Sequence, residues 1–238
     1  MLAAGVITGF SKFSVGGMGL LILPVIMIAF EGPQALGIIL PMYIVTDLLA
    51  VASYRKNISW SLLKRLLPLC AAGMLLGGWL LSHLDTHQFT LLLALMIIAM
   101  LVLSIVMDNL ESRFMRHPLV ASVIGFIGGI VSMMSNAAGP LFSLYFMEQK
   151  LDKVTYVSTR SWAFLLINLA KIPMLLSLGL LTIESTMTSF QAIPGLVVGA
   201  FIGYWLLKKL NLTQFKWMIR IMASIAATKL MYAAFWII

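Results

Sequence analysis

The chain has 238 residues, of which 61% are hydrophobic and 10% are charged. A soluble domain carries about 25% charged residues, so this composition excludes a soluble globular enzyme, a disordered chain and a disulfide scaffold. It indicates an all-α polytopic membrane protein. The 16 Lys and Arg against 8 Asp and Glu are typical of cytoplasmic loops in such a protein, and no nucleic-acid partner is expected.

A spanning helix needs about 20 mainly apolar residues, and two of the apolar stretches are interrupted. In chain order the sequence predicts a broken segment at 2–30, spanning helices at 33–54, 62–82 and 88–107, a second broken segment at 118–147, and spanning helices at 157–181, 189–207 and 212–237. The polar, glycine-rich stretches 11–19 and 132–140 form the two interruptions. The first segment then consists of half-helices of about 14–16 Å, half the hydrocarbon core of about 30 Å.

The two halves of the chain resemble each other, which predicts two repeats, 1–112 and 113–238, within one membrane domain. Pro68–Leu81 aligns with Pro194–Leu207 at an offset of 126, and proline, tryptophan and a GxxxG pair coincide. At an offset of 120, Gly5, Gly9 and Gly19 fall on Gly125, Gly129 and Gly139. The GxxxG pairs Gly73/Gly77 and Gly199/Gly203 predict close helix packing.

The basic residues distinguish two topologies for the broken segments. If both segments crossed the membrane, the loop cations would divide six to five between the two sides, whereas eleven share one face if each segment enters and leaves on the same side. The eleven are Arg55, Lys56, Lys64, Arg65, Arg113, Arg116, Lys150, Lys153, Lys208, Lys209 and Lys216, and the opposite loops carry Glu31, Asp85 and Glu184. The positive-inside rule favours the second arrangement. Each repeat is then a re-entrant helical hairpin followed by three transmembrane helices, and the repeats are inverted with both termini outside, which is a transporter architecture.

Irregular backbone at membrane depth is tolerated only where protein or a water-filled cavity satisfies it. The half-helices after the two breaks start near Gly17 and Pro140, and the free N–H groups at such helix ends favour anions. We therefore expect an anion site between the tips, formed by Ser11, Lys12, Ser14, Gly16, Gly17 and Gly19 on one side and Ser132, Ser135, Asn136 and Gly139 on the other. The alternative is that the glycines only allow helices to pack closely.

Ionisable residues inside apolar segments are functional candidates because their burial is costly. Lys171, one turn after Asn168, is predicted either to bind or guide the anion or to form a structural ion pair with Asp47. Asp47 is also a candidate carrier of a coupling proton, and Arg160 is expected to be interfacial or ion-paired. Lys12 is either a substrate contact or a neutral buried lysine. No metal site is expected, since His83, Asp85 and His87 fall in a short loop that should be solvated.

The break motif GFSKFSVGGMGLLILP, repeated in degenerate form as GGIVSMMSNAAGP, resembles the sulfite exporter TauE/SafE family, and INLAKIP, with Lys171, fits the second half of that pattern. The resemblance covers essentially the whole chain. It implies transport of sulfite, organosulfonates and related small anions across the cytoplasmic membrane of prokaryotes. The chain departs from the pattern at Met18, where a third consecutive glycine is common, and at Asn136–Ala138, where glycines would be expected.

The sequence therefore predicts a secondary transporter of small anions in the inner (cytoplasmic) membrane, and not an enzyme. Export of sulfite or an organosulfonate by alternating access is the favoured function. An anion channel, and proton-coupled uptake of a sulfur-containing or carboxylate anion, stay as alternatives. The expected partners are a small sulfur oxyanion and membrane lipid, with a homodimer as an assembly that the sequence allows, and no cofactor is expected.

Overall fold

The computed structural model describes residues 1–13, 19–54, 57–107 and 117–207, together with 217, 220–221, 224–225 and 227–232 near the end of the chain. These residues are helical apart from short connections, and they include no β-strand. The helices are α1 (Leu2–Phe13), α2 (Gly19–Ile26), α3 (Gln34–Ser53), α4 (Trp60–Leu81), α5 (Thr86–Met107), α6 (Pro118–Ser135), α7 (Gly139–Met147), α8 (Lys153–Ser177), α9 (Ile183–Phe190) and α10 (Ile193–Leu207).

The prediction of a helical membrane protein is confirmed. Within the part of the chain that the structure describes, three helices are long and apolar enough to cross a bilayer: α3, α4 and the 86–103 part of α5. The bent pair α9–α10 would be a fourth if it forms one span. α8 has 25 residues and is long enough. The mean hydropathy of α8 is lower than that of α3, α4 and α5, because Arg160, Asn168 and Lys171 interrupt its apolar sequence.

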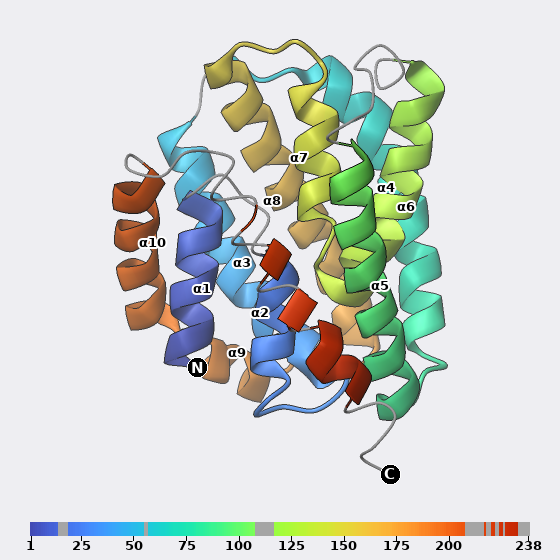
Figure 1. Cartoon of the computed structure of the whole chain (residues 1–238), viewed down its shortest axis with the longest axis vertical. Coiled ribbons are helices and arrows are strands. Elements are labelled where there is room, and N and C mark those ends of the chain that lie inside the picture. Colours follow the sequence, from blue (N-terminus) through green and yellow to red (C-terminus); the bar gives the residue numbers. More distant parts are fainter. Residues whose placement is uncertain are drawn as a thin grey trace.

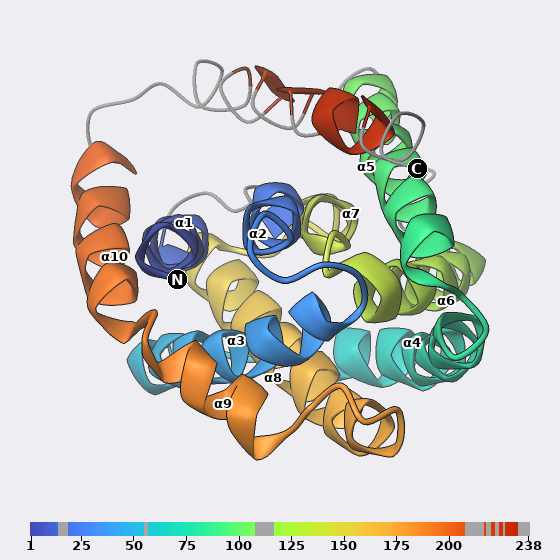
Figure 2. The ribbon, with the colours of Figure 1, turned by 90° about the horizontal axis from the view of Figure 1, so that it is seen from below.

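Figure 1 shows the two broken helix pairs at opposite ends of the molecule. α1 and α2 have their outer ends at the lower end, where the chain continues into α3, whereas α6 and α7 have theirs at the upper end. The inner ends of both pairs face the middle of the structure. Seen from below in Figure 2, α1, α2 and α7 lie between α10 on one side and α5 on the other, and α3 and α8 pack across them.

Glycines bring two pairs of helices unusually close. A Cβ added at Gly9 of α1 would lie 2.0 Å from the carbonyl oxygen of Leu196 in α10, and one at Gly129 of α6 would lie 2.1 Å from the carbonyl oxygen of Cys70 in α4. Only a residue without a Cβ fits these contacts. The GxxxG glycines of α4 and α10 complete the same two interfaces, as their spacing predicts.

Both interruptions are shorter than the sequence suggests. α1 continues through Phe13, so Ser11 and Lys12 are helical, and α6 continues through Ser135, which leaves only 136–138 as the second break. Serine is compatible with a helix here because its hydroxyl can donate to the carbonyl one turn earlier, as Ser135 Oγ does to Val131 O at 2.7 Å.

The expected single helix at 189–207 is wrong, because the structure divides this region. α9 begins earlier, at Ile183, and the axis bends by 48° between α9 and α10. A capping box starts α9: Thr182 Oγ1 accepts from the Ser185 N–H, and Ser185 Oγ accepts from the Thr182 N–H. Pro194 lies in the first turn of α10, where its missing N–H is tolerated, whereas it cannot continue α9.

The last expected helix, 212–237, is helical where it is described, at 217, 220–221, 224–225 and 227–232. Its other positions lie outside the described residues.

Candidate functional site: a cation-lined cavity

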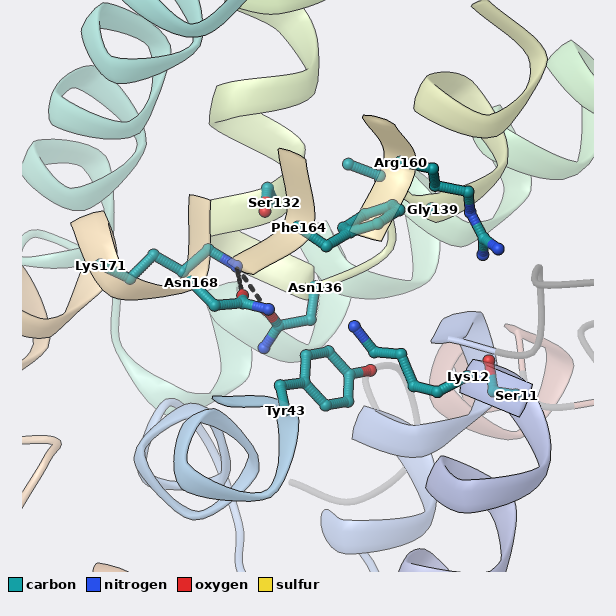
Figure 3. A pocket seen from close by; sticks show the side chains of 11 residues that line it. Ser11, Lys12, Tyr43, Ser132, Asn136, Gly139, Arg160, Phe164, Asn168 and Lys171 are labelled. Atoms are coloured by element: carbon teal, nitrogen blue, oxygen red, sulfur yellow. Dashed lines mark hydrogen bonds between the residues drawn. The ribbon is translucent and has the colours of Figure 1, made fainter. Parts of the chain in front are cut away.

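A small cavity lies where the inner end of α1 and the break between α6 and α7 meet α3 and α8 (Figure 3). Its volume is about 40 Å³. A buried water needs roughly 10–15 Å³ on this measure, so the cavity accommodates about three waters or one small oxyanion. The lining residues are Ser11 and Lys12 of α1, Tyr43 of α3, Ser132, Asn136, Ala138 and Gly139 around the second break, and Arg160, Phe164, Asn168 and Lys171 of α8.

One face of α8 provides the largest share of the lining. Arg160, Phe164, Asn168 and Lys171 are four, four and three residues apart, which places them above one another along the helix. The start of α8 is fixed by Asp152, whose carboxylate accepts from the N–H groups of Val154 and Thr155 at 3.0 and 3.1 Å. This N-cap sets where the helix begins and hence the register of the stripe.

The ammonium of Lys171 is deeply buried at the cavity, with 2% of the residue exposed. It donates to Asn136 Oδ1 at 2.6 Å and to Asn168 Oδ1 at 3.1 Å (Figure 3). Both partners are neutral amides. Lys171 therefore has hydrogen bonds but, among the described residues, no carboxylate partner to balance its charge. A buried cation in this state favours an anion beside it.

One interpretation of the sequence required an ion pair between Asp47 and Lys171, but these two residues do not pair in the structure. The two carboxylate oxygens of Asp47 are occupied by other groups: Lys12 forms an ion pair and hydrogen bond with Oδ1, and Asn168 Nδ2 donates to Oδ2 at 2.6 Å. A continuous chain of polar contacts thus runs from Lys12 through Asp47, Asn168 and Lys171 to Asn136. It connects the inner end of α1 with the second break.

Two aromatic rings surround the ammonium of Lys12. Its Nζ lies 4.7 Å from the ring centre of Tyr43 and 4.9 Å from that of Phe164, distances at which the ring quadrupole attracts a cation. The guanidinium of Arg160 lies 5.4 Å from the same Phe164 ring. Among the described residues that line or contact the cavity, three cationic side chains thus stand against one carboxylate, so the local field is positive.

Asn136 adopts a backbone conformation that few residues accept. Its φ of 54° and ψ of 15° are left-handed, and its N–H closes α6 by donating to Ser132 O at 3.2 Å. Asparagine tolerates this conformation better than most residues with a Cβ. The turn directs the chain into α7 and leaves the Asn136 amide at the cavity.

Most predicted site residues that the structure describes come together here. Lys12, Ser132, Asn136, Gly139, Asn168, Lys171 and Arg160 line the cavity, and Asp47 contacts two of them. Ser135 does not line it, because its hydroxyl donates to Val131 within α6 and accepts from the Ala137 N–H. Gly19 begins α2, while Ser14, Gly16 and Gly17 lie outside the described residues.

Two aromatic lining residues, Tyr43 and Phe164, were not predicted from the sequence. Each lies four residues before a polar site residue, Asp47 and Asn168 respectively. Helical spacing places such pairs on one face. That spacing was the available signal, but an aromatic side chain in an apolar helix does not otherwise differ from core.

The fold and the cavity together define a class: a helical membrane protein with a buried, positively charged site between two broken helices. The model of the sulfite exporter TauE/SafE family matches residues 1–230 of the chain. The chain belongs to this family, and it is therefore a membrane protein of a family of anion and sulfite transporters, whose members are not enzymes. Searches of curated proteins and of solved structures found no significant match.

Proposed function

We propose that this protein exports sulfite or an organosulfonate across the cytoplasmic membrane by alternating access, and that the cavity between the two broken helix pairs holds the anion during transport. The observation that carries the proposal is the state of Lys171, a buried ammonium bound by two amide oxygens. A bound anion would provide the missing negative charge. Lys12 has that charge already, from Asp47.

The arrangement of helices supports an inverted repeat. α1 packs along α10 through Gly9, and α6 packs along α4 through Gly129, so each broken segment contacts a helix of the opposite half of the chain. The two broken pairs open toward opposite ends of the molecule (Figure 1). Transporters with discontinuous helices bind substrate where such repeats meet, near the midplane, and move one part against the other.

The loops support an orientation in the membrane. The connections at 57–59 and 148–152 lie at the upper end in Figure 1, and those at 27–33, 82–85 and 178–182 lie at the lower end. In the sequence, Lys64 and Arg65 follow the first of the upper connections and Lys150 belongs to the second. The positive-inside rule assigns the upper end to the cytoplasm. The N-terminus, at the lower end in Figure 1, is then outside.

The membrane potential supports export. A negative-inside potential assists the exit of an anion by about 2.3 kcal/mol per charge for each 100 mV. Outward movement of a lone anion therefore needs no coupling ion, whereas uptake would need one. The ion pair that Lys12 and Asp47 form is consistent with a structural role for this carboxylate.

The test is equilibrium binding of sulfite to the purified protein, combined with sulfite flux in proteoliposomes. Lys171→Gln keeps an N–H donor for the two amides but removes the charge, so we expect sulfite affinity to fall by about 10- to 150-fold, the range for one charged hydrogen bond. Lys64→Gln removes an exposed cation of α4 and should leave affinity unchanged. Equal affinity in wild type and Lys171→Gln would refute the site, and flux that does not saturate with sulfite would indicate a channel.

A further inference from the structure

The cavity presents hydrogen-bond donors that have no partner in the part of the chain that the structure describes. The hydroxyl of Tyr43 is buried without a partner among the described residues, and Tyr43 as a whole is 5% exposed. Nε of Arg160 is likewise buried without a hydrogen-bond partner among the described residues. The Lys171 ammonium has three N–H groups and donates two of them to amides, so one remains. All three residues line the cavity.

The side-chain carboxylate and amide oxygens around the cavity each already accept a hydrogen bond. Oδ1 of Asn136 and Oδ1 of Asn168 each face the Lys171 ammonium. The two oxygens of Asp47 face Lys12 and the Asn168 amide. Tyr43 and the serines can donate or accept through their hydroxyls, and beside an anion they act as donors. The oxygens of a bound anion therefore find donors. A hydroxyl on that anion finds, among the described residues, no side-chain carboxylate or amide oxygen that does not already accept a hydrogen bond.

We propose that this cavity selects oxyanions that carry no hydroxyl, such as sulfite and sulfonates, against oxyanions that carry one, such as hydrogen phosphate. The inference rests on the proposed function and narrows its substrate class. A ligand hydroxyl that faces only donors cannot donate its own hydrogen, and its oxygen accepts a weaker hydrogen bond than an anionic oxygen does. That loss corresponds to roughly 10- to 100-fold weaker binding.

Two pairs of dianions separate the hydroxyl from size and element. Sulfate and hydrogen phosphate both have four oxygens, but only hydrogen phosphate carries an O–H in mildly alkaline buffer. Sulfite and phosphite both have three oxygens, and the hydrogen of the phosphite dianion is on phosphorus. We expect calorimetric titration of the purified full chain to give similar affinities for sulfite and phosphite, and affinity for hydrogen phosphate about 10- to 100-fold below that for sulfate.

An engineered acceptor should reverse the preference. Asn136→Asp keeps an oxygen for Lys171, replaces the amide N–H₂ with a second acceptor, and suits the left-handed backbone. We expect the ratio of hydrogen phosphate to sulfate affinity to rise at least about 10-fold, whereas Ser132→Ala should weaken both anions alike.

Each outcome decides between the two proposals. Equal binding of sulfate and hydrogen phosphate by the wild type, or an unchanged ratio in Asn136→Asp, would overturn the selectivity and leave anion transport standing. Failure of the wild type to bind any of the four anions would overturn both.

Discussion

Lys12, near the end of α1, and Asn136, at the second break, line one cavity but meet different partners. Lys12 is a cation, and Asp47 neutralises it within the protein. Asn136 is neutral and accepts from Lys171, whose other partner is also an amide. The side of the cavity next to the first broken pair is therefore electrostatically complete without a ligand. The side next to the second is not, and we place the negative charge of the substrate there.

We expect the largest loss of stability when the counter-charge of Lys12 is removed, on the side of the cavity where the charges are balanced. Asp47→Asn leaves Lys12 as a partly buried cation without a counter-charge, and removing one partner of a buried pair costs about 3–5 kcal/mol. We expect a loss of this size in unfolding experiments in detergent. Lys12→Met combined with Asp47→Asn should recover most of it, because neither charge is then left alone.

For Lys171 we expect the opposite result, a small loss of stability and a large loss of anion binding. Since this cation has no carboxylate partner, Lys171→Gln should cost much less stability than Asp47→Asn while it abolishes most anion binding. If the two variants lost equal stability, the two sides of the cavity would not differ in the way described.

A second prediction concerns what the two broken pairs share. Gly9→Ala and Gly129→Ala each place a Cβ against a backbone carbonyl, at 2.0 and 2.1 Å, and overpacking of this kind costs about 1–3 kcal/mol. We expect similar losses from both, measured as shifts in thermal unfolding. Gly139→Ala is the matched control for stability, because a Cβ there meets nothing within 4 Å. A loss at Gly139 equal to that at Gly9 would contradict close approach as the cause.

A third prediction separates backbone from side chain at the second break. Asn136→Gly and Asn136→Ala both remove the acceptor of Lys171, so both should weaken anion binding equally. Alanine disfavours the left-handed conformation by about 1–2 kcal/mol, whereas glycine adopts it freely. Asn136→Ala should therefore be the less stable of the two by about 1 kcal/mol, and equal stability would show that the break relaxes on substitution.

The smallest effect is expected outside both broken pairs, at the N-cap of α8. Hydrogen bonds from Thr155, whose side chain and N–H both donate to the carboxylate, lower the pKa of Asp152 below its ordinary value. The cap therefore stabilises the fold above the ordinary carboxyl pKa, and this contribution is lost as the pH falls through the lowered pKa. Asp152→Ala should be slightly less stable than wild type at neutral pH, and the two should converge in acid. Asp152→Asn, which keeps a capping oxygen, should remove the pH dependence.

The sequence could predict the polar residues of the site because lysine, aspartate and asparagine inside apolar helices are costly and therefore informative. Lys171, Asn168 and Lys12 were found in this way. Tyr43 and Phe164 were not, since an aromatic ring in a membrane helix is ordinary until a cation is placed over it. The partner of Asp47 was equally undetermined, because Lys12 and Lys171 are both lysines in apolar surroundings.

The local sequence is also not sufficient to predict whether a proline ends a helix. Pro68 and Pro194 occupy equivalent positions in the two aligned stretches, yet α4 runs through Pro68 whereas α10 begins beside Pro194. Proline is tolerated inside a membrane helix when neighbouring groups compensate for the lost hydrogen bond. Whether it breaks a helix therefore depends on contacts that a local pattern does not contain.

Hydrophobic length, the positions of glycine and the count of basic residues determined by themselves that this chain is a helical membrane protein with two interrupted segments. These properties are local, because each segment must satisfy its own backbone and match the bilayer. The tertiary structure alone decided which lysine Asp47 neutralises and which it leaves for a ligand, since that choice depends on distances between helices far apart in the sequence.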